Sequence, residues 1–305
     1  MFDPSTLPTP GRRVPDTRQE RPIAVPHPLL DAVDTPQDPA AFLRSIGTVH
    51  TTFGDQDSGA VSYGVHAEGN WFVKTGPNPA SALSLRRAID LHAHVRHPAI
   101  VPILHTFTAG GVPVTVGPWQ SGEVLYHATV KRSGKLLRTG AASPLARFRA
   151  LPLDDVHAAL DAILDAHRLI DAAGYVGVDW YDGCVLYDFP ARRVHLIDLD
   201  EYRSAPFVLD CARLSGSTRY MPPEHSRRGA LVTRAGTVFL LGRTLRLLLD
   251  AGDEERAWRG TLAQLAVVER ATRRDPAERY SNVTELFDAW SAVAPAGMLS
   301  GTYRV

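Results

Sequence analysis

The sequence predicts an α+β protein, with short strands in the first part of the chain and mainly helices in the second. Short apolar runs separated by Gly, Asn and Pro turn signals follow one another between residues 45 and 125, a pattern typical of strands. After residue 150, apolar side chains recur at helical spacing over longer stretches, which is typical of helices that cover a core. A chain of 305 residues is long enough to bury a sizeable core.

The first 44 residues differ from the rest of the chain in composition. Nine of the 23 prolines fall within the first 39 residues. Because such a segment has little capacity to build a core of its own, residues 1–44 are expected to form a mobile or surface-wrapping tail. Residues 299–305 are expected to form a short C-terminal tail.

The first two strands are expected on either side of a glycine-containing turn. This turn reads Gly54-Asp55-Gln56-Asp57-Ser58-Gly59-Ala60-Val61, and Ser62-Tyr63-Gly64-Val65 follows it. Glycines at such a turn let backbone amides approach phosphate oxygens, although the same pattern describes an ordinary hairpin turn. A second turn at Glu68-Gly69-Asn70 leads into the third strand, Trp71-Phe72-Val73-Lys74.

Lys74 ends the third predicted strand and is unusual for this chain. The sequence contains 30 Arg but three Lys, at positions 74, 131 and 135. A compact ammonium group at the end of an apolar strand is well suited to contact two phosphates, which favours a binding role for Lys74. A strand-end lysine that extends into solvent is the alternative.

A helix is expected over residues 80–95, and His97-Pro98 follows it before the next apolar run. Three histidines lie close together here, but His92 and His94 do not share a helix face, so no zinc site is predicted. Residues 112–125 are expected to form a strand that runs into a Gly- and Pro-containing connection. A long helix should follow, from a cap at Asp154 to about Ala173, before Gly174 ends it.

Two aspartates frame the next predicted element, a strand–turn–strand hairpin. Asp179 precedes the strand at 184–187 and Asp198 follows the strand at 194–197, so both carboxylates should lie at one rim of the hairpin. A site that transfers a phosphoryl group needs one carboxylate to orient the acceptor and another to hold magnesium. Aspartate also commonly begins and ends turns, so the hairpin alone leaves both interpretations open.

The order of these features resembles the protein-kinase-like superfamily, in particular small bacterial serine/threonine protein kinases with divergent catalytic motifs. The resemblance covers roughly residues 45–295. It rests on Trp71-Phe72-Val73-Lys74, on Gly216-Ser217-Thr218-Arg219-Tyr220-Met221-Pro222-Pro223-Glu224 and on Asp275-Pro276-Ala277-Glu278-Arg279. It implies a bilobal protein-kinase-like fold, with a small antiparallel-sheet N-lobe at 45–117 and a mainly helical C-lobe at 118–298. It also implies an ion pair between Glu224 and Arg279.

The resemblance further implies roles for individual residues. The positions that correspond to nucleotide-binding residues are Gly54, Gln56, Gly59, Val61 and Lys74. Asp179 would be the catalytic residue that orients the acceptor hydroxyl or accepts its proton, and Asp198 would hold magnesium. Asp182 is a substitute candidate for a second magnesium ligand, although Asp182-Gly183 also describes a turn.

Several positions depart from the pattern of that family. Gln56 replaces the middle glycine of the loop, and Tyr181 replaces a lysine that steadies the transferred group. Cys184 replaces the asparagine that holds a second magnesium, and a thiol is a poor ligand for a hard cation. The helix glutamate that pairs with the lysine would fall at Ala88, and the nearest acid, Asp90, lies on another face.

The resemblance implies an ATP-dependent phosphotransferase that uses ATP and Mg2+ and transfers the γ-phosphoryl group to a Ser/Thr hydroxyl of a protein. Two alternatives stay open. A kinase for a small-molecule hydroxyl, of the antibiotic-modifying type, fits the missing loop lysine. A pseudokinase, acting as a nucleotide-responsive or purely scaffolding module, fits the missing helix glutamate and magnesium asparagine.

Composition adds expectations about partners and location. The formal net charge is zero, with Arg and acidic residues interspersed, so neither a nucleic acid nor a membrane partner is expected. The chain lacks a long apolar run and a hydrophobic N-terminal signal, and its two cysteines suggest no disulfide framework, so a cytoplasmic location is expected. A monomer or weak dimer is expected.

Overall fold

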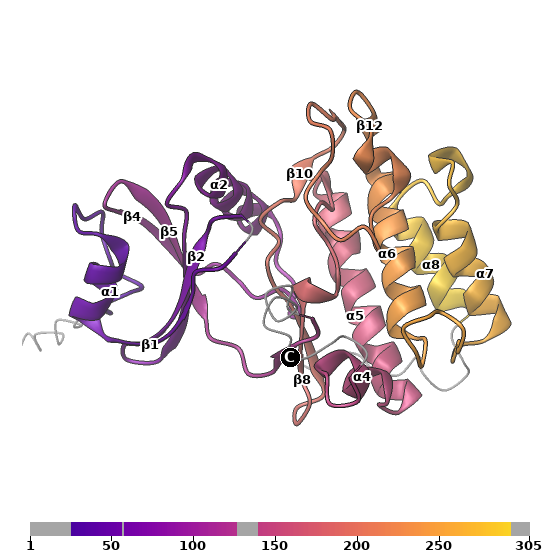
Figure 1. The fold of residues 1–305 in the computed structure, drawn as a ribbon, viewed down its shortest axis with the longest axis horizontal. Helices are drawn as coiled ribbons and strands as arrows, with labels where there is room; N and C mark the ends of the chain where they lie inside the picture. Colours follow the sequence, from indigo (N-terminus) through magenta and orange to yellow (C-terminus); the bar gives the residue numbers. More distant parts are fainter. Residues whose placement is uncertain (1–25, 57, 127–139, 294–305) are drawn as a thin grey trace, which may run out of the picture.

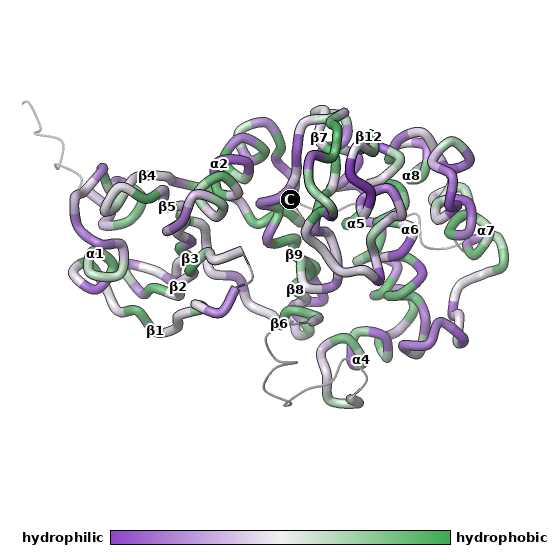
Figure 2. Tube along the Cα trace, turned by 45° about the horizontal axis from the view of Figure 1, so that its top comes forward, coloured by the Kyte–Doolittle hydropathy of each residue, from purple (hydrophilic) through white to green (hydrophobic). Residues whose placement is uncertain are grey.

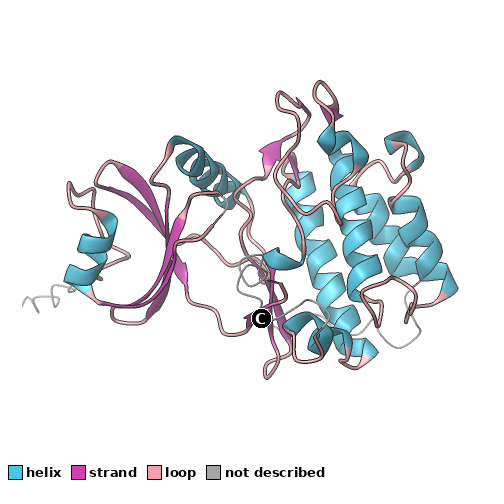
Figure 3. Cartoon of the chain, in the orientation of Figure 1, coloured by secondary structure: helices cyan, strands magenta, loops and turns pink. Residues whose placement is uncertain are grey.

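The computed structural model describes residues 26–56, 58–126 and 140–293, and its fold is mixed α+β (Figures 1 and 3). A five-stranded antiparallel sheet forms one part of the molecule, and helices with short strand pairs form the other. Each part has its own cluster of buried hydrophobic residues. They are called here the sheet part (residues 26–119) and the helical part (residues 120–126 and 140–293).

The sheet has the strand order β1-β2-β3-β5-β4. Its strands are β1 Thr48–Phe53, β2 Val61–His66, β3 Asn70–Thr75, β4 His105–Ala109 and β5 Val112–Pro118. Because side chains alternate along a strand, Val73 and Val116 are buried together on one face. Lys74 pairs in register with Ser62 and Thr115, so these three side chains lie on the opposite face.

Residues 26–46 cover the face of the sheet that is opposite Lys74. Helix α1 Pro39–Ile46 is capped by the Asp38 side chain and lies on the side of the sheet away from the helical part (Figure 1). Leu29 and Leu43 are buried in the core of the sheet part. The prediction of a mobile tail over residues 1–44 is therefore wrong for residues 26–44, which pack on the sheet. The remaining tail residues, 1–25 and 299–305, lie outside the described part of the chain.

Helix α2 Pro79–His94 confirms the helix predicted at residues 80–95. Its N-cap Asn78 forms a capping box with Ser81, and a proline occupies the first turn. The helix lies on the side of the sheet nearer the helical part (Figure 1). Leu91 and Val95, near its C-terminal end, are buried in the core of the helical part, so α2 connects the two parts.

The described helical part contains α4 Pro144–Arg149, α5 Leu153–Ala172, α6 Arg234–Leu248, α7 Leu262–Ala271 and α8 Val283–Ala292. Hydrophilic and hydrophobic residues alternate along these helices, as expected where one face is buried (Figure 2). Helix α5 confirms the long predicted helix, but its N-cap is Pro152, and Asp154 lies in the first turn instead. An acid in the first turn still stabilises a helix N-terminus. None of the described helices is long and apolar enough to cross a membrane.

Three small sheets complete the described helical part. They are β6 Glu123–Val124, β8 Val185–Asp188 and β9 Arg193–Leu196 in one sheet, β7 Tyr175–Val176 with β10 Arg203–Ser204, and β11 Phe207–Val208 with β12 Leu231–Val232. Three 3-10 helices are present among the described residues: η1 Asp182–Cys184, η2 Pro223–Ser226 and η3 Pro276–Glu278. The antiparallel pairing of β8 with β9 confirms the predicted hairpin.

Candidate active site

Lys74 and Asp198 meet between the sheet part and the helical part. The Lys74 side chain, on β3, is 10% exposed, and its Nζ donates to Asp198 Oδ1 at 2.5 Å. A second ion pair joins the same ammonium to Asp200. The structure therefore brings together Lys74 and Asp198, which are 124 positions apart and to which the resemblance gives the nucleotide and the magnesium ion, and Asp200 is an additional partner.

The two carboxylates keep Lys74 charged. Burial alone would lower the pKa of Lys74, but Asp198 and Asp200 outweigh it and raise this pKa above its ordinary value. The side chain of Asp200 is 16% exposed and that of Asp198 is 48% exposed. Asp198 is therefore the carboxylate that solvent or a ligand can reach, while Asp200 holds the lysine from the buried side.

Asp179 lies beside this group of charges, after β7. Burial is the main cause that raises the pKa of Asp179 to about 7, and the charges of Asp198 and Glu201 raise it further against the opposing effect of Lys74. A carboxyl group with that pKa is partly ionised at neutral pH and can accept a proton there. The electrostatic coupling agrees with the prediction that Asp179 and Asp198 share one rim.

Both aspartates have an uncommon backbone conformation. The φ angle is 60° at Asp179 and also at Asp198, in the left-handed region that few residues other than glycine adopt. Aspartate tolerates this region better than most residues, and strained residues concentrate at functional sites. Gly216 packs against the first of them, since a Cβ on Gly216 would lie 3.4 Å from Asp179 Cα.

Two threonines of α6 hold residues on either side of Asp179, one through its backbone and the other through its side chain. Gly177 N donates to Thr237 Oγ1 at 2.8 Å, and Trp180 Nε1 donates to Thr244 Oγ1 at 2.9 Å. Trp180 is fully buried, so Asp179 lies between two anchored neighbours. No local pattern in the sequence marks these hydroxyls as supports for the site, because contacts between distant segments leave no spacing signal.

The residues expected near a second magnesium ion do not form a complete metal site. Cys184 is buried, and its Sγ donates to Asp179 O at 3.2 Å. Burial raises the pKa of Cys184 well above its ordinary value, so the sulfur stays a protonated thiol. Asp182 is buried in η1. Within the described ranges no group of three His, Cys, Asp or Glu side chains could hold a metal ion, so the role of Asp182 stays a prediction.

Asp198 still fits a magnesium ion that is carried by a nucleotide. Magnesium keeps several waters and binds one or two protein carboxylates together with phosphate oxygens, so a full protein cage is not required. Asp198 is half exposed, and its contact with Lys74 uses Oδ1. This carboxylate is therefore available to a cation that enters with phosphates.

The loop between β1 and β2 contains most of the predicted glycine-rich positions. Gln56 Nε2 donates to Ser62 Oγ at 2.9 Å, and Gly59 N donates to Gln56 O at 2.9 Å. Ser62 is the register neighbour of Lys74, so the loop is fastened beside the ammonium. Gly59 has a φ of 71°, a backbone conformation that favours glycine. A Cβ on Gly54 would meet no atom within 4 Å, so the space there would admit a side chain. Gln56 thus closes the loop with its own side chain.

Val61 does not face the site. Its register partner is Thr75, and it packs against the core of the sheet part. Because side chains alternate along β2, the neighbouring Ser62 lies on the Lys74 face and Val61 on the other. The prediction that Val61 contacts a nucleotide is therefore wrong.

Three aromatic residues lie on the Lys74 side of the sheet, and we call Phe53, Phe72 and Trp119 the aromatic platform. The ring centroid of Phe72 lies 6.5 Å from that of Phe53 and 6.3 Å from that of Trp119. Gly64 makes room for it, since a Cβ there would lie 2.7 Å from Trp119 Cζ3. Phe53 and Trp119 are partly exposed, so their rings could stack on a planar base. The one local signal for this platform is the spacing of Phe72 and Lys74, which are two residues apart on one strand and so share a face.

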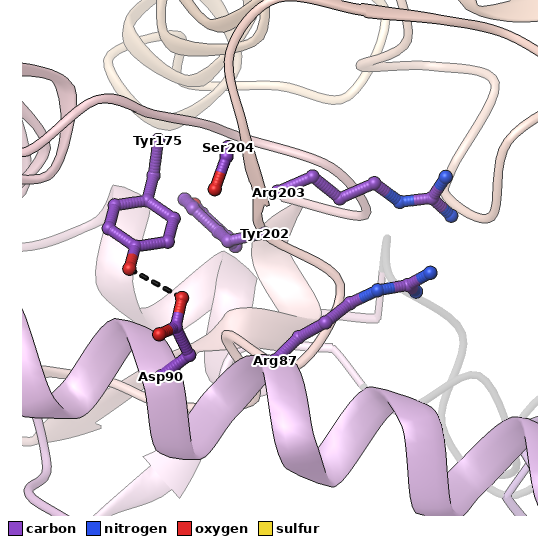
Figure 4. A pocket seen from close by; sticks show the side chains of 6 residues that line it. All are labelled: Arg87, Asp90, Tyr175, Tyr202, Arg203 and Ser204. Atoms are coloured by element: carbon purple, nitrogen blue, oxygen red, sulfur yellow. Dashed lines mark hydrogen bonds between the residues drawn. The ribbon is translucent and has the colours of Figure 1, made fainter.

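Helix α2 supplies no acidic partner to Lys74. Ala88, at the position expected for a glutamate, is buried. Asp90 Oδ2 accepts a hydrogen bond from Tyr175 OH at 2.6 Å (Figure 4). The second carboxylate on the lysine comes from Asp200.

The predicted ion pair between Glu224 and Arg279 is confirmed. Arg279 donates from its two terminal nitrogens to Glu224 Oε1 at 2.6 Å and Oε2 at 3.0 Å. The Arg279 side chain is 0% exposed and the Glu224 side chain is 8% exposed. This pair ties the end of the 216–224 segment to the connection before α8.

Comparison of the sequence with protein-family models finds no family that matches, and comparison with characterised proteins finds no significant similarity.

Proposed function

We propose that this chain is an ATP-dependent phosphotransferase with a bilobal protein-kinase-like fold, which transfers the γ-phosphoryl group of ATP to a Ser/Thr hydroxyl. The sheet part would be its N-lobe and the helical part its C-lobe. The observation that supports this proposal most is the contact between Lys74 and Asp198 beside Asp179. Phosphoryl transfer requires a cation for the phosphates, a carboxylate for the metal and a carboxylate for the acceptor, and this group offers all three.

Each residue has a separate task in this proposal. Bound ATP and magnesium would supply the transferable phosphoryl group and neutralise part of its charge. Lys74 would bind phosphate oxygens, in exchange for part of its contact with Asp198 and Asp200. Asp198 would hold the metal, and the aromatic platform would stack on the base. Asp179 would orient the acceptor hydroxyl and accept its proton, for which a pKa of about 7 is well suited.

The test is transfer from γ-labelled ATP in the presence of magnesium, with the label followed into protein and into soluble products. Asp198→Asn and Asp179→Asn should each reduce transfer by about 10²–10³. Asp188→Asn is the matched control, because Asp188 lies at the turn of the same hairpin, where it accepts a hydrogen bond from Ala191 N. Transfer that survives both active-site changes would refute the proposed roles. Label in a soluble product other than inorganic phosphate would identify a small-molecule acceptor.

A pseudokinase is the second candidate, and one observation favours it. Cys184 occupies the position of a magnesium-binding asparagine and uses its thiol to support the Asp179 carbonyl. Thermal unfolding with ATP, with and without magnesium, separates the two candidates. A magnesium-dependent rise in melting temperature that Asp198→Asn abolishes supports the enzyme, whereas no response to nucleotide supports a scaffold.

A further inference from the structure

Helix α2 presents a polar face to the helical part. Ser84, Arg87 and Asp90 follow one another at a spacing of three residues and so lie on one side of the helix. Arg87 Nη1 donates to Glu201 Oε2 at 2.8 Å, and Ser84 Oγ also contacts the Glu201 carboxylate. Asp90 contacts Tyr175, as Figure 4 shows. The N-terminal half of α2 is thus joined to the helical part through Glu201.

Glu201 directly follows the residue that holds Lys74. Asp200 pairs with Lys74 of β3, and Glu201 pairs with Arg87 of α2. One short segment, Asp198 to Glu201, therefore fastens both a strand and a helix of the sheet part. A shift of α2 would move Glu201, and the peptide bond would transmit this shift to Asp200.

The contacts of Glu201 are largely shielded from solvent, so they can influence where α2 and Asp200 lie. The Glu201 side chain is 17% exposed and that of Arg87 is 24% exposed. Arg203, from β10, lies 3.6 Å from the same carboxylate, and it lines a cavity together with Arg87 and Tyr175 (Figure 4). Charge-assisted hydrogen bonds in such surroundings are stronger than those between fully exposed groups.

The two halves of α2 are held in different ways. Near its C-terminal end, Leu91 and Val95 are buried in the hydrophobic core of the helical part. Near its N-terminus, the N-cap Asn78 contacts Gly59 of the β1–β2 loop, with Nδ2 3.4 Å from Gly59 O. A change at Ser84 or Arg87 should therefore loosen the contact between this half of the helix and the helical part, while the other end stays anchored.

We propose that Glu201 is a positioning residue, whose contacts with Ser84 and Arg87 place α2 and, through the adjoining Asp200, direct the Lys74 ammonium. Helix α2 carries the cation Arg87, and the 198–201 segment carries Asp200 and Glu201. The link between the helix and Lys74 therefore runs through two consecutive carboxylates. The importance of this link for phosphoryl transfer rests on the proposed function. The link itself is testable without any catalysis.

The chain allows a direct measurement, because Lys74 is one of three lysines. The folded protein is treated with an amine-acylating reagent, and mass spectrometry compares the labelling rate of Lys74 with those of Lys131 and Lys135. Glu201→Gln and Arg87→Gln should each raise the relative rate at Lys74 by about tenfold, because loss of a charge-assisted contact frees the segment that shields it. The double variant should be no more reactive than the Glu201→Gln variant, since Arg87 acts through Glu201.

Two further variants keep the test decisive. Ser84→Ala removes one contact without removing a charge, so it should give a smaller increase in the same direction even if the charge variants fold poorly. Arg192→Gln breaks the Arg192–Asp155 pair of the helical part and should leave Lys74 unchanged. Unchanged labelling in the folded Ser84 and Glu201 variants, or additive effects of Glu201 and Arg87, would overturn the proposal. Absence of phosphoryl transfer in the unaltered protein would instead refute the proposed function and leave the labelling result standing.

Discussion

Replacing Glu224 with alanine is expected to destabilise the protein by about 3–5 kcal/mol, the usual cost of breaking a buried ion pair by removing one partner. Arg279 uses all five N–H donors of its guanidinium, and they go to both Glu224 oxygens and to the carbonyls of Arg273, Arg274 and Ala235. The alanine variant leaves two of these donors and a buried charge without their acceptor. Arg279 has no exposed side-chain surface, so water cannot replace the lost carboxylate without a structural change.

The assay is urea unfolding, followed by thermal unfolding of the same samples. For a protein of this size, the expected loss corresponds to a melting temperature lower by about 6–20 °C. Glu254→Ala is the matched control, because Glu254 pairs with Arg256 at 3.4 Å while their side chains are 78% and 84% exposed. That change should cost less than about 1 kcal/mol. Equal small losses in both variants would refute the reasoning that burial makes the Glu224 pair important.

Three other predictions follow from burial and charge. The transfer rate should rise with pH and level off above about 7. Burial raises the pKa of Asp179 to about 7, and this carboxyl group accepts a proton only when it is ionised. A flat profile of the transfer rate from pH 5 to 9 would contradict this. Because this raised pKa means that the folded state binds the proton more tightly than the unfolded state, ionisation of Asp179 should reduce stability as pH rises from about 4 to 7. Asp179→Asn should therefore melt at a higher temperature than the unaltered protein at pH 8, with a difference that shrinks toward pH 4. In a thiol-labelling assay, Cys211 should react rapidly in the folded protein because it is exposed. Cys184 should react only after unfolding because it is buried. Two rapidly reacting thiols in the folded protein would be the contrary result.

Local patterns in the sequence were sufficient for most of the individual elements. Helices α2 and α5 and the β8–β9 hairpin were predicted close to their actual bounds, because periodicity and Gly or Pro signals act over a few residues. The proline content of residues 26–44 favours a mobile tail, but these residues pack on the sheet. Pro39 instead lies in the first turn of α1, where the missing N–H costs nothing.

In the candidate site, too, the sequence indicates which residues take part, whereas the tertiary structure decides which of them face one another. The resemblance to protein kinases was enough to select Lys74, Asp179 and Asp198 as partners, and Lys74 and Asp198 do meet. It gave the wrong environment for Val61, because the register of β2 against β3 decides which side chains share a face with Lys74.

What the chain alone determines is which residues can form helices, strands and turns, and which carry the chemistry of a candidate site. Tertiary packing alone decides that Asp200 and Glu201 hold β3 and α2, because ion pairs between segments more than 100 positions apart depend on docking, which no local spacing encodes. The raised pKa of Asp179 has the same origin, since burial and neighbouring carboxylates exist only once the two parts pack together.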